Sequence, residues 1–408
     1  MNSQLKHRLC TTNLIVRNSD KTPLADSKVT VAQTNHSFLF GNAAFDTVPL
    51  ANGAYNGAEL EKAQQRAERL TDLFNAATLP FYWGQFEPVR GKPRTQELRQ
   101  AARWCVEHGM TVKGHPLCWH TMTAPWLMDL SNAEILKAQA ERIHRDLNDF
   151  RGLIQMWDVI NEAVIMPIFD KYDNGITRIC KQNGRIATIK TMFENARAEN
   201  PTATLLINDF DTSTSYDILI EGCLAVGVKF DVIGIQSHMH QGYWGLEKTQ
   251  EILERFSRFN LPIHFTENTL VSGHLMPPEI VDLNDYQVTD WPTTPEGEER
   301  QAREVVQHYE TLMAHPLVEG ITWWDLYDGL WLNAPSGLLR RDGSPKPAYE
   351  ELLKRVKGEW WLAPTELRTD AHGQVQVTGF AGNYEIEVNG KKQAFSLAKG
   401  QEQTEVLL

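Results

Sequence analysis

The sequence of 408 residues lacks the features that mark several classes of protein. It has five cysteines, widely spaced and without a C-x-x-C pair, so neither a disulfide framework nor a zinc site is indicated. We expect free, buried thiols, as in a reducing compartment. No apolar run approaches the length of a membrane span. The first 14 residues have no apolar core of signal-peptide length. A cytoplasmic protein is therefore expected if this start is native, and a secreted one if a leader has been removed.

The sequence also has no surplus of basic residues. It carries 40 Lys and Arg against 52 Asp and Glu, a net charge of -12. This balance argues against a nucleic-acid or anionic-membrane partner, because no excess of positive charge exists to bind phosphates. There is no P-loop, and no cofactor or metal is indicated. Twelve tryptophans are many for this length, and aromatic faces commonly stack on neutral sugars. Oligomeric state does not follow from these features.

Between residues 37 and 361, short apolar runs alternate with helical patterns about eight times. This alternation predicts a (β/α)8 barrel, an α/β TIM barrel. A doubly wound open sheet is the alternative, but no G-x-G-x-x-G follows the first strand. Ser131 and Glu134 form a capping box that predicts the start of a helix. The longest irregular loop, 268–294, is expected to be a lid or a binding loop. We expect strands at 38–43, 78–83, 111–114, 153–160, 204–208, 231–236, 262–266 and 320–325.

The two ends of the chain have a different pattern. In the terminal segments 1–36 and 362–408, apolar residues recur at every second position over 10–36 and 362–408, and Asn389-Gly390 is a strong hairpin turn. Neither segment alone is long enough for a good core. We therefore predict that they pair into one small β-sandwich beside the barrel. Two separate β-ribbons packed on the barrel are the alternative.

Polar side chains follow the predicted strands where each strand ends. Glu162 follows the apolar run that begins at Leu153, and Glu267 follows the run that begins at Leu261. Because the carboxyl ends of the strands of a parallel barrel meet at one rim, we expect both carboxylates at one site. Imidazole, indole and amide groups converge on the same rim. The residues expected there are Tyr82, Trp83, His115, His120, Asn161, Gln236, His238, Trp324 and Trp331.

Two carboxyl groups are what hydrolysis of a glycosidic bond requires. Burial and the charge of Glu267 should raise the pKa of Glu162, which makes Glu162 the candidate acid and base. Glu267 would stay ionised and attack the anomeric carbon, with Gln236 or His238 holding it in place. A spacing of about 5–5.5 Å between the carboxyls would give a retaining mechanism. Asn161 would face the sugar 2-hydroxyl, and Trp324 and Trp331 would form the floor and wall of the sugar site.

Other polar residues are interpreted as structural. His238 and His240 are not expected to share a metal ion, because we expect their rings to face opposite sides of a strand. Glu87 and Asp158 are expected to be structural partners, and His115 is either a scaffold residue or a sugar contact. Trp360 and Trp361 should pack the barrel against the β-module.

These motifs resemble glycoside hydrolase family 10, the endo-β-1,4-xylanases. The resemblance covers about residues 38–356. It is carried by Gly114-His115, Trp119-His120, Trp157-Asp158-Val159-Ile160-Asn161-Glu162, Asn208-Asp209, Gln236-Ser237-His238, Thr266-Glu267, Ile321-Thr322-Trp323-Trp324 and Pro345-Lys346-Pro347-Ala348-Tyr349. It implies that Glu162 is the acid/base and Glu267 the nucleophile of a retaining xylanase without a cofactor. By the same resemblance, the residues around the cleaved sugar are His120, Asn161, Gln236, His238, Trp324 and Trp331.

The sequence departs from the family pattern at two places. In the family, the second strand carries Glu-Asn and then Lys-Trp, which hold the sugar next to the cleavage point on the glycone side. Here Tyr82 stands at the lysine position and the Glu-Asn pair is missing. After the nucleophile, the family's Thr-Glu-Leu-Asp becomes Thr266-Glu267-Asn268-Thr269. These departures leave the substrate of the glycone side open. Short or decorated xylosides and other β-glycosides such as β-glucan stay open, as does a non-catalytic carbohydrate-binding barrel.

Overall fold

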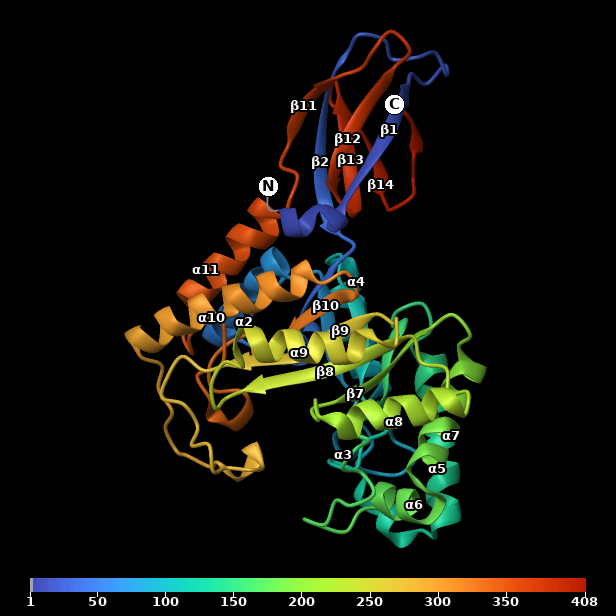
Figure 1. Ribbon diagram of the computed structural model, residues 1–408, viewed down its shortest axis with the longest axis vertical. Coiled ribbons are helices and arrows are strands. Elements are labelled where there is room, and N and C mark those ends of the chain that lie inside the picture. Colours follow the sequence, from blue (N-terminus) through green and yellow to red (C-terminus); the bar gives the residue numbers. More distant parts are fainter. Residues whose placement is uncertain (1–2) are drawn as a thin grey trace.

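The computed structural model describes residues 3–408. It contains a closed barrel of eight parallel strands and, at one end, a smaller module of two mainly antiparallel sheets (Figure 1). The barrel closes because β10 pairs in parallel with β9 on one side and with β3 on the other. The predicted (β/α)8 fold is therefore confirmed, and the open-sheet alternative is wrong.

The eight barrel strands follow one another around the ring in chain order. All eight residues of the strand before the long loop are buried, as expected for a parallel strand covered by helices outside and side chains inside. The strands are β3 (Leu39–Ala43), β4 (Ala76–Pro80), β5 (Thr111–His115), β6 (Met156–Asn161), β7 (Thr204–Asp209), β8 (Val232–Met239), β9 (Ile263–Leu270) and β10 (Val318–Trp323).

Helices surround the barrel and cover its strands (Figure 1). Ser131 and Glu134 form the expected capping box at the start of α5, which satisfies two backbone donors that the first turn leaves free. The helices are α1 (Thr47–Ala51), α2 (Gly57–Leu73), α3 (Trp83–Phe86), α4 (Thr95–Glu107), α5 (Asn132–Asp149), α6 (Gly175–Asn183), α7 (Arg185–Glu199), α8 (Thr214–Ala225), α9 (Gly245–Ser257), α10 (Pro295–Ala314) and α11 (Pro347–Lys354). Among residues 3–408, no helix has the length and apolar character needed to cross a bilayer.

Five of the eight strands begin within one residue of the predicted position, whereas β4, β6 and β10 begin two or three residues away from it. β6 begins at Met156 rather than 153, because the backbone N–H groups of Leu153 and Ile154 both donate to the carbonyl of Phe150 and so close the turn after α5. β4 lies two residues earlier than predicted and ends at Pro80. Proline cannot donate a backbone hydrogen bond, which fits its place at the end of the strand.

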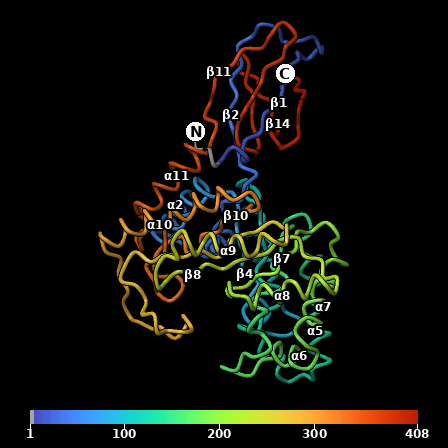
Figure 2. The backbone as a smooth tube through the Cα atoms, viewed as in Figure 1, coloured from blue at the N-terminus to red at the C-terminus, as the bar shows by residue number. Residues whose placement is uncertain are grey.

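The terminal segments form one module, as predicted. Figure 2 shows the blue amino-terminal strands and the red carboxyl-terminal strands side by side. In one sheet, β1 (Leu9–Arg17) lies between β12 (Gln374–Phe380) and β15 (Gln403–Leu407). The other sheet has the order β11 (Thr365–Arg368), β2 (Lys28–His36), β13 (Gly382–Val388) and β14 (Lys391–Leu397). The alternative of two separate ribbons is wrong. The boundaries at 1–36, 37–361 and 362–408 stay a prediction.

The module has its own core and contacts the barrel at the end where the strands begin. Leu14, Val31, Tyr384 and other buried apolar residues from both sheets form that core. Arg8 donates hydrogen bonds to the carbonyls of Met313, His315 and Val318, just before and at the start of β10. The module therefore lies opposite the carboxyl-terminal rim, where barrel enzymes place their chemistry.

Candidate active site

A cavity of about 950 Å³ opens at the carboxyl ends of the barrel strands. Apart from Trp83, every residue that the sequence predicts for the site lines this cavity. The two glutamates come from strands β6 and β9, which are three positions apart on the eight-strand ring. Their side chains therefore meet across the rim rather than along one strand.

Glu162 follows β6 directly and lines the cavity, with its side chain 14% exposed. Its backbone has a φ of +57°, a left-handed conformation that is uncommon outside glycine and concentrates at functional sites. Burial, together with the charges of Asp209 and Glu267, raises the pKa of Glu162 to about 8, although the hydrogen bonds with Trp119 and Gln236 act in the opposite direction. Glu162 is therefore protonated at neutral pH and can serve as an acid.

Glu267 has the opposite electrostatic environment. Burial opposes its ionisation, but the nearby imidazoles of His115 and His238 outweigh this and hold the pKa of Glu267 below its usual value. His238 Nε2 lies 3.2 Å from one carboxylate oxygen, and Asn208 Nδ2 donates to the other at 2.8 Å. His238 thus holds Glu267, as expected, whereas the second contact comes from Asn208 and not from Gln236.

Three amide side chains connect the two glutamates. Asn161 Oδ1 accepts hydrogen bonds from Asn208 Nδ2 at 2.8 Å and from Gln236 Nε2 at 3.0 Å. Gln236 Nε2 also lies 3.5 Å from Glu162 Oε1. Asn208 fits here because residue 234 is a glycine, and a Cβ at that position would collide with the Asn208 amide. Each amide is therefore fixed by its neighbours, which fixes the orientation of both carboxyls.

Behind Glu267, buried charges orient His115. Asp158 accepts from His115 Nδ1 at 2.7 Å and pairs with Lys113 at 2.7 Å. His115 Nε2 then lies 3.9 Å from Glu267 Oε1. Burial disfavours the Asp158 carboxylate, but Lys113 and His115 outweigh this and lower the pKa of Asp158. Asp158 is thus a structural partner, as predicted, and His115 is both a scaffold residue and a lining residue.

His238 and His240 differ from the prediction in one respect. Their rings face the same side, because residues two apart on a strand point in the same direction. Thr269 Oγ1 lies 3.5 Å from His238 Nδ1 and 3.2 Å from His240 Nδ1. Burial lowers the pKa of His240 to about 3, so this ring is neutral. Within residues 3–408, no three His, Cys, Asp or Glu side chains are grouped to hold a metal ion.

Aromatic rings form much of the cavity surface. Trp324 is 7% exposed and meets His115 and His238 edge-on, and Trp331 lies 4.5 Å from the His238 ring. Burial lowers the pKa of His120 to about 4, and its Nε2 lies 3.8 Å from Glu162 Oε2. Flat apolar surfaces beside neutral polar groups suit a sugar ring, which has C–H faces and hydroxyl edges.

The β3–β4 side of the cavity is more apolar than the family pattern implies. Tyr82 packs against Phe45, His115 and Trp119 at ring distances of 5.6–5.8 Å. Burial and then the charges of both glutamates raise the pKa of Tyr82 well above 10, so its hydroxyl stays protonated. Leu50 and Ala67 continue this lining. A ring and a neutral hydroxyl therefore replace the cation of the family at this position.

Trp83 is the predicted site residue that the structure places elsewhere. It begins α3, is 3% exposed, and donates from Nε1 to Glu87 Oε2 at 3.1 Å. Consecutive residues at the strand–helix turn point in different directions, so Tyr82 enters the cavity while Trp83 packs outward against Trp126. Glu87 also pairs with Arg145 and is structural, as predicted.

Several lining residues were not predicted. Asn208, which contacts Glu267 but does not line the cavity, is part of the family resemblance and was given no role, although it precedes Asp209 at the end of β7, the same signal that identified Asn161 and Glu162. Leu50 and Ala67 lie on helices α1 and α2. Others lie on loops, where no periodic pattern marks direction. They include Phe45, Phe169, Lys171, Tyr172, Phe210, Trp244 and Asp282.

Comparison with known proteins agrees with this geometry. The sequence model of "Glycosyl hydrolase family 10" matches residues 43–355. Endo-1,4-beta-xylanase A of Cellvibrio japonicus is 31% identical over 282 residues, which cover 62% of this chain and 46% of that protein. Endo-1,4-beta-xylanase 2 of Arabidopsis thaliana is 24% identical over 322 residues, 76% of this chain and 26% of that protein. The chain thus spans less than half the length of these two relatives.

Solved structures share the fold. A GH10 structure from Paenibacillus barcinonensis has a TM-score of 0.64 at 24% identity, covering 78% of this chain and 95% of that one. Xylanase 10B of Thermotoga petrophila, solved with xylobiose, has a TM-score of 0.62 at 21% identity, covering 79% and 95%. The family match extends over most of the barrel and includes both glutamates, so this chain belongs to glycosyl hydrolase family 10.

Proposed function

We propose that this protein is a retaining glycoside hydrolase that cleaves β-1,4-xylosidic bonds in xylan or xylo-oligosaccharides. The observation that carries the proposal is the pair of buried glutamates with opposite pKa displacements in one cavity. Such a pair supplies a protonated acid and an ionised nucleophile at the same pH. A non-catalytic barrel would have no need to maintain this difference.

The reaction proceeds in two displacements. Glu267 attacks the anomeric carbon while Glu162 gives its proton to the leaving glycosidic oxygen, which leaves a glycosyl ester on Glu267. Glu162 is then a carboxylate and removes a proton from water, and the water oxygen attacks the same carbon. The ester breaks, Glu267 is released as a carboxylate, and Glu162 is protonated again. The anomeric configuration is retained because it is inverted twice.

The substrate class rests on family membership and on the cavity lining. Two relatives carry the name endo-1,4-beta-xylanase, and a structure with the same fold was solved with xylobiose. Trp324 and Trp331 offer faces for pyranose rings, and the Asn161 amide lies beside Glu162, where a 2-hydroxyl group would sit. The Asn161 contact would strengthen as positive charge develops on the sugar.

A second candidate substrate is a decorated or small-molecule xyloside, or another β-glycoside such as β-glucan. The observation that favours it is the apolar surface of Phe45, Leu50 and Tyr82, where the family carries charged and amide groups. An acyl or aryl group would bury apolar area there, which a plain xylose unit would not.

The test is a product profile on xylan, xylo-oligosaccharides, cello-oligosaccharides and aryl β-xylosides, with Glu267→Ala as the control. We expect xylose-based products whose first-formed anomer, observed by NMR, is β. Hydrolysis by Glu267→Ala at the wild-type rate would contradict the assignment of Glu267 as the nucleophile. An α-anomer as the first product would contradict the retaining mechanism. Activity on cello-oligosaccharides alone would select the second candidate.

A further inference from the structure

The connection between β9 and α10 is much longer than its neighbours and has its own small core. We define residues 271–294 as the strap; it includes the short 3-10 turn Leu283–Asp285 (η3) and appears gold to orange in Figure 1. Val271, Met276 and Trp291 of the strap are buried together against Ala334. Trp291 Nε1 donates to the carbonyl of His274. The strap is therefore a folded extension.

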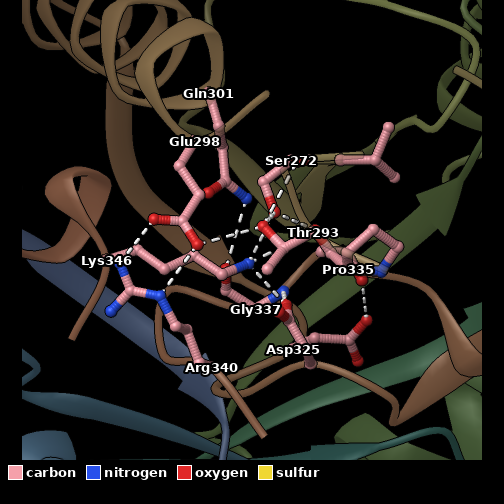
Figure 3. A network of polar contacts seen from close by, with 12 residues as sticks. Ser272, Thr293, Glu298, Gln301, Asp325, Pro335, Gly337, Arg340 and Lys346 are labelled. Carbon is pink, nitrogen blue, oxygen red and sulfur yellow. Dashed lines mark hydrogen bonds and ion pairs between the residues drawn. The ribbon is translucent and has the colours of Figure 1, made fainter. Parts of the chain in front are cut away.

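The two ends of the strap, at Ser272 and Thr293, are called its feet here. A network of polar contacts fixes both of them (Figure 3). Ser272 Oγ accepts from Lys346 Nζ at 2.7 Å and lies 2.7 Å from Thr293 Oγ1, which joins the two feet directly. Thr293 Oγ1 also donates to Glu298, and Glu298 forms a two-point ion pair with Arg340. The fixed feet hold the strap at a defined angle to the barrel.

The tip of the strap crosses the mouth of the barrel. Lys171, in the segment 162–174 after β6, forms ion pairs with Asp282 at 2.5 Å and Asp285 at 2.7 Å. β6 and β9 are three positions apart on a ring of eight strands, close to opposite. A direct contact between their loops must therefore pass over the rim. Lys171 and Asp282 line the same cavity as Glu162 and Glu267, so the Lys171–Asp282 ion pair forms part of the cavity wall.

The bridge separates two parts of the cleft. On one side lie Phe45 and Tyr82, from the β3 and β4 ends. On the other side lie Phe210 and Trp244, in the short connections 210–213 and 240–244 after β7 and β8. A sugar chain long enough to contact both groups has to pass beneath the Lys171–Asp282 pair.

We propose that the strap, closed by Lys171, restricts the cleft to substrates that enter endwise, so that short xylo-oligosaccharides are preferred over the interior of long xylan chains. This inference rests on the proposed function. An open groove receives an internal segment of a polymer from above, whereas a bridged groove admits it only by threading or after the tip has opened. Lys171, Asp282 and Asp285 are therefore specificity-determining residues.

The ion pairs of Lys171 with Asp282 and Asp285 are exposed enough to break and re-form. The side chains of Lys171, Asp282 and Asp285 are 40%, 35% and 62% exposed. Ion pairs this exposed are weak and are screened by salt. Trp331 Nε1 adds a 3.3 Å contact to Asn284 Oδ1, which links the tip to a lining tryptophan. Salt should therefore weaken the closure without disturbing the fixed feet.

The test compares the wild type with Lys171→Glu, which replaces both attractions by repulsion, and with Lys137→Ala as a control. Lys137 also forms an exposed ion pair, with Glu141 on α5, away from the cleft. We expect Lys171→Glu to raise kcat/KM on long, soluble xylan at least about fivefold relative to that on xylotetraose, with a larger loss of viscosity per bond cleaved. Raising the NaCl concentration should also raise the ratio of kcat/KM on xylan to kcat/KM on xylotetraose for the wild type. The same ratio should stay unchanged for Lys171→Glu.

A second readout does not depend on the substrate. Backbone amides of residues 277–290 should exchange with deuterium faster in Lys171→Glu than in the wild type, and at the wild-type rate in Lys137→Ala. Unchanged exchange in Lys171→Glu, or an unchanged preference between xylan and xylotetraose, overturns the inference. Absence of wild-type activity on every xyloside overturns the proposed function instead, and the exchange result then still decides whether Lys171 holds the strap closed.

Discussion

Asn208 Nδ2 donates a 2.8 Å hydrogen bond to Glu267 Oε1 and so fixes one oxygen of the nucleophile. The same amide group donates to Asn161, and Asn208 Oδ1 accepts from Thr266 at 2.6 Å. One asparagine thus connects the nucleophile to the residue that precedes the acid. Its position depends on Gly234, whose missing side chain leaves room for it.

Replacing Asn208 by alanine should reduce kcat/KM about 10–100-fold, because a hydrogen bond to a charged group contributes about 1.5–3 kcal/mol. Steady-state kinetics on an aryl xyloside would measure this. Asn195→Ala, on α7 beside His144, is a control that removes an asparagine outside the cavity. Equal activity of the two variants would show that Asn208 does not position Glu267.

The pH dependence of kcat/KM should be bell-shaped. Glu162 must be protonated, and its pKa is raised to about 8, so activity should fall as the pH rises through about 8. Glu267 must be ionised, and its pKa is lowered, so activity should fall on the acid side only below its usual value of 4.5. Asp209→Asn removes a negative charge beside Glu162 and should move the alkaline limb to lower pH. If the alkaline limb of Asp209→Asn lies at the wild-type pH, a group other than Glu162 causes that limb.

Glu162→Ala should separate substrates by their leaving groups. Loss of the acid should reduce cleavage of xylo-oligosaccharides about 10²–10⁴-fold, the usual contribution of general acid catalysis. An aryl xyloside with an acidic phenol needs no proton to leave, so formation of its glycosyl ester should change far less. Burst kinetics on both substrates would measure this. Equal losses on both would contradict the assignment of Glu162 as the acid.

Tyr82→Lys should restore the cation that the family carries at this position. A positive charge near Glu162 favours its ionised form, so the pKa of Glu162 should fall and the alkaline limb should shift to lower pH. A hydrogen-bonding cation should also lower KM for xylo-oligosaccharides relative to aryl xylosides. Tyr82→Phe is the control for loss of the hydroxyl alone. If Tyr82→Lys and Tyr82→Phe behave alike, charge at this position does not control the site.

Lys346→Met should destabilise the fold by about 3–5 kcal/mol, because it leaves Asp328 buried without its cation. The side chains of Lys346 and Asp328 are 0% and 5% exposed and lie 2.5 Å apart. Urea unfolding would measure this, with Lys137→Met as the exposed control. The double variant Lys346→Met/Asp328→Leu should recover much of the loss. A loss below about 1 kcal/mol would show that the pair is not needed for stability.

Much of the barrel follows from local sequence. Buried parallel strands give short apolar runs, and Ser131 with Glu134 marks a helix start by hydrogen bonding that depends on four residues alone. The residues at strand ends could be assigned to one rim because parallel strands all end on the same side. Glu162, Glu267 and the residues around them were predicted on this basis.

The remaining features depend on contacts between distant segments. Whether Tyr82 or Trp83 enters the cavity depends on the turn into α3, which the periodic pattern does not specify. The contact of Lys171 with Asp282 joins loops more than 100 residues apart, and no local signal marks it. His238 and His240 were assigned to opposite faces by an error of strand periodicity, and their shared contact with Thr269 shows the correct direction.

The β-module imposes an order on assembly. β1 pairs with β12 across a separation of 367 residues, from Thr11 to Thr378, and its other neighbour is the last strand, β15. During synthesis, β1 and β2 therefore emerge before the barrel, and their edges stay unpaired until the barrel and the strands after it have been made. Unpaired edges are prone to join other chains. Removing residues 362–408 should thus leave a barrel that can close. The strands β1 and β2 would then lack their partners, and the protein should aggregate through them.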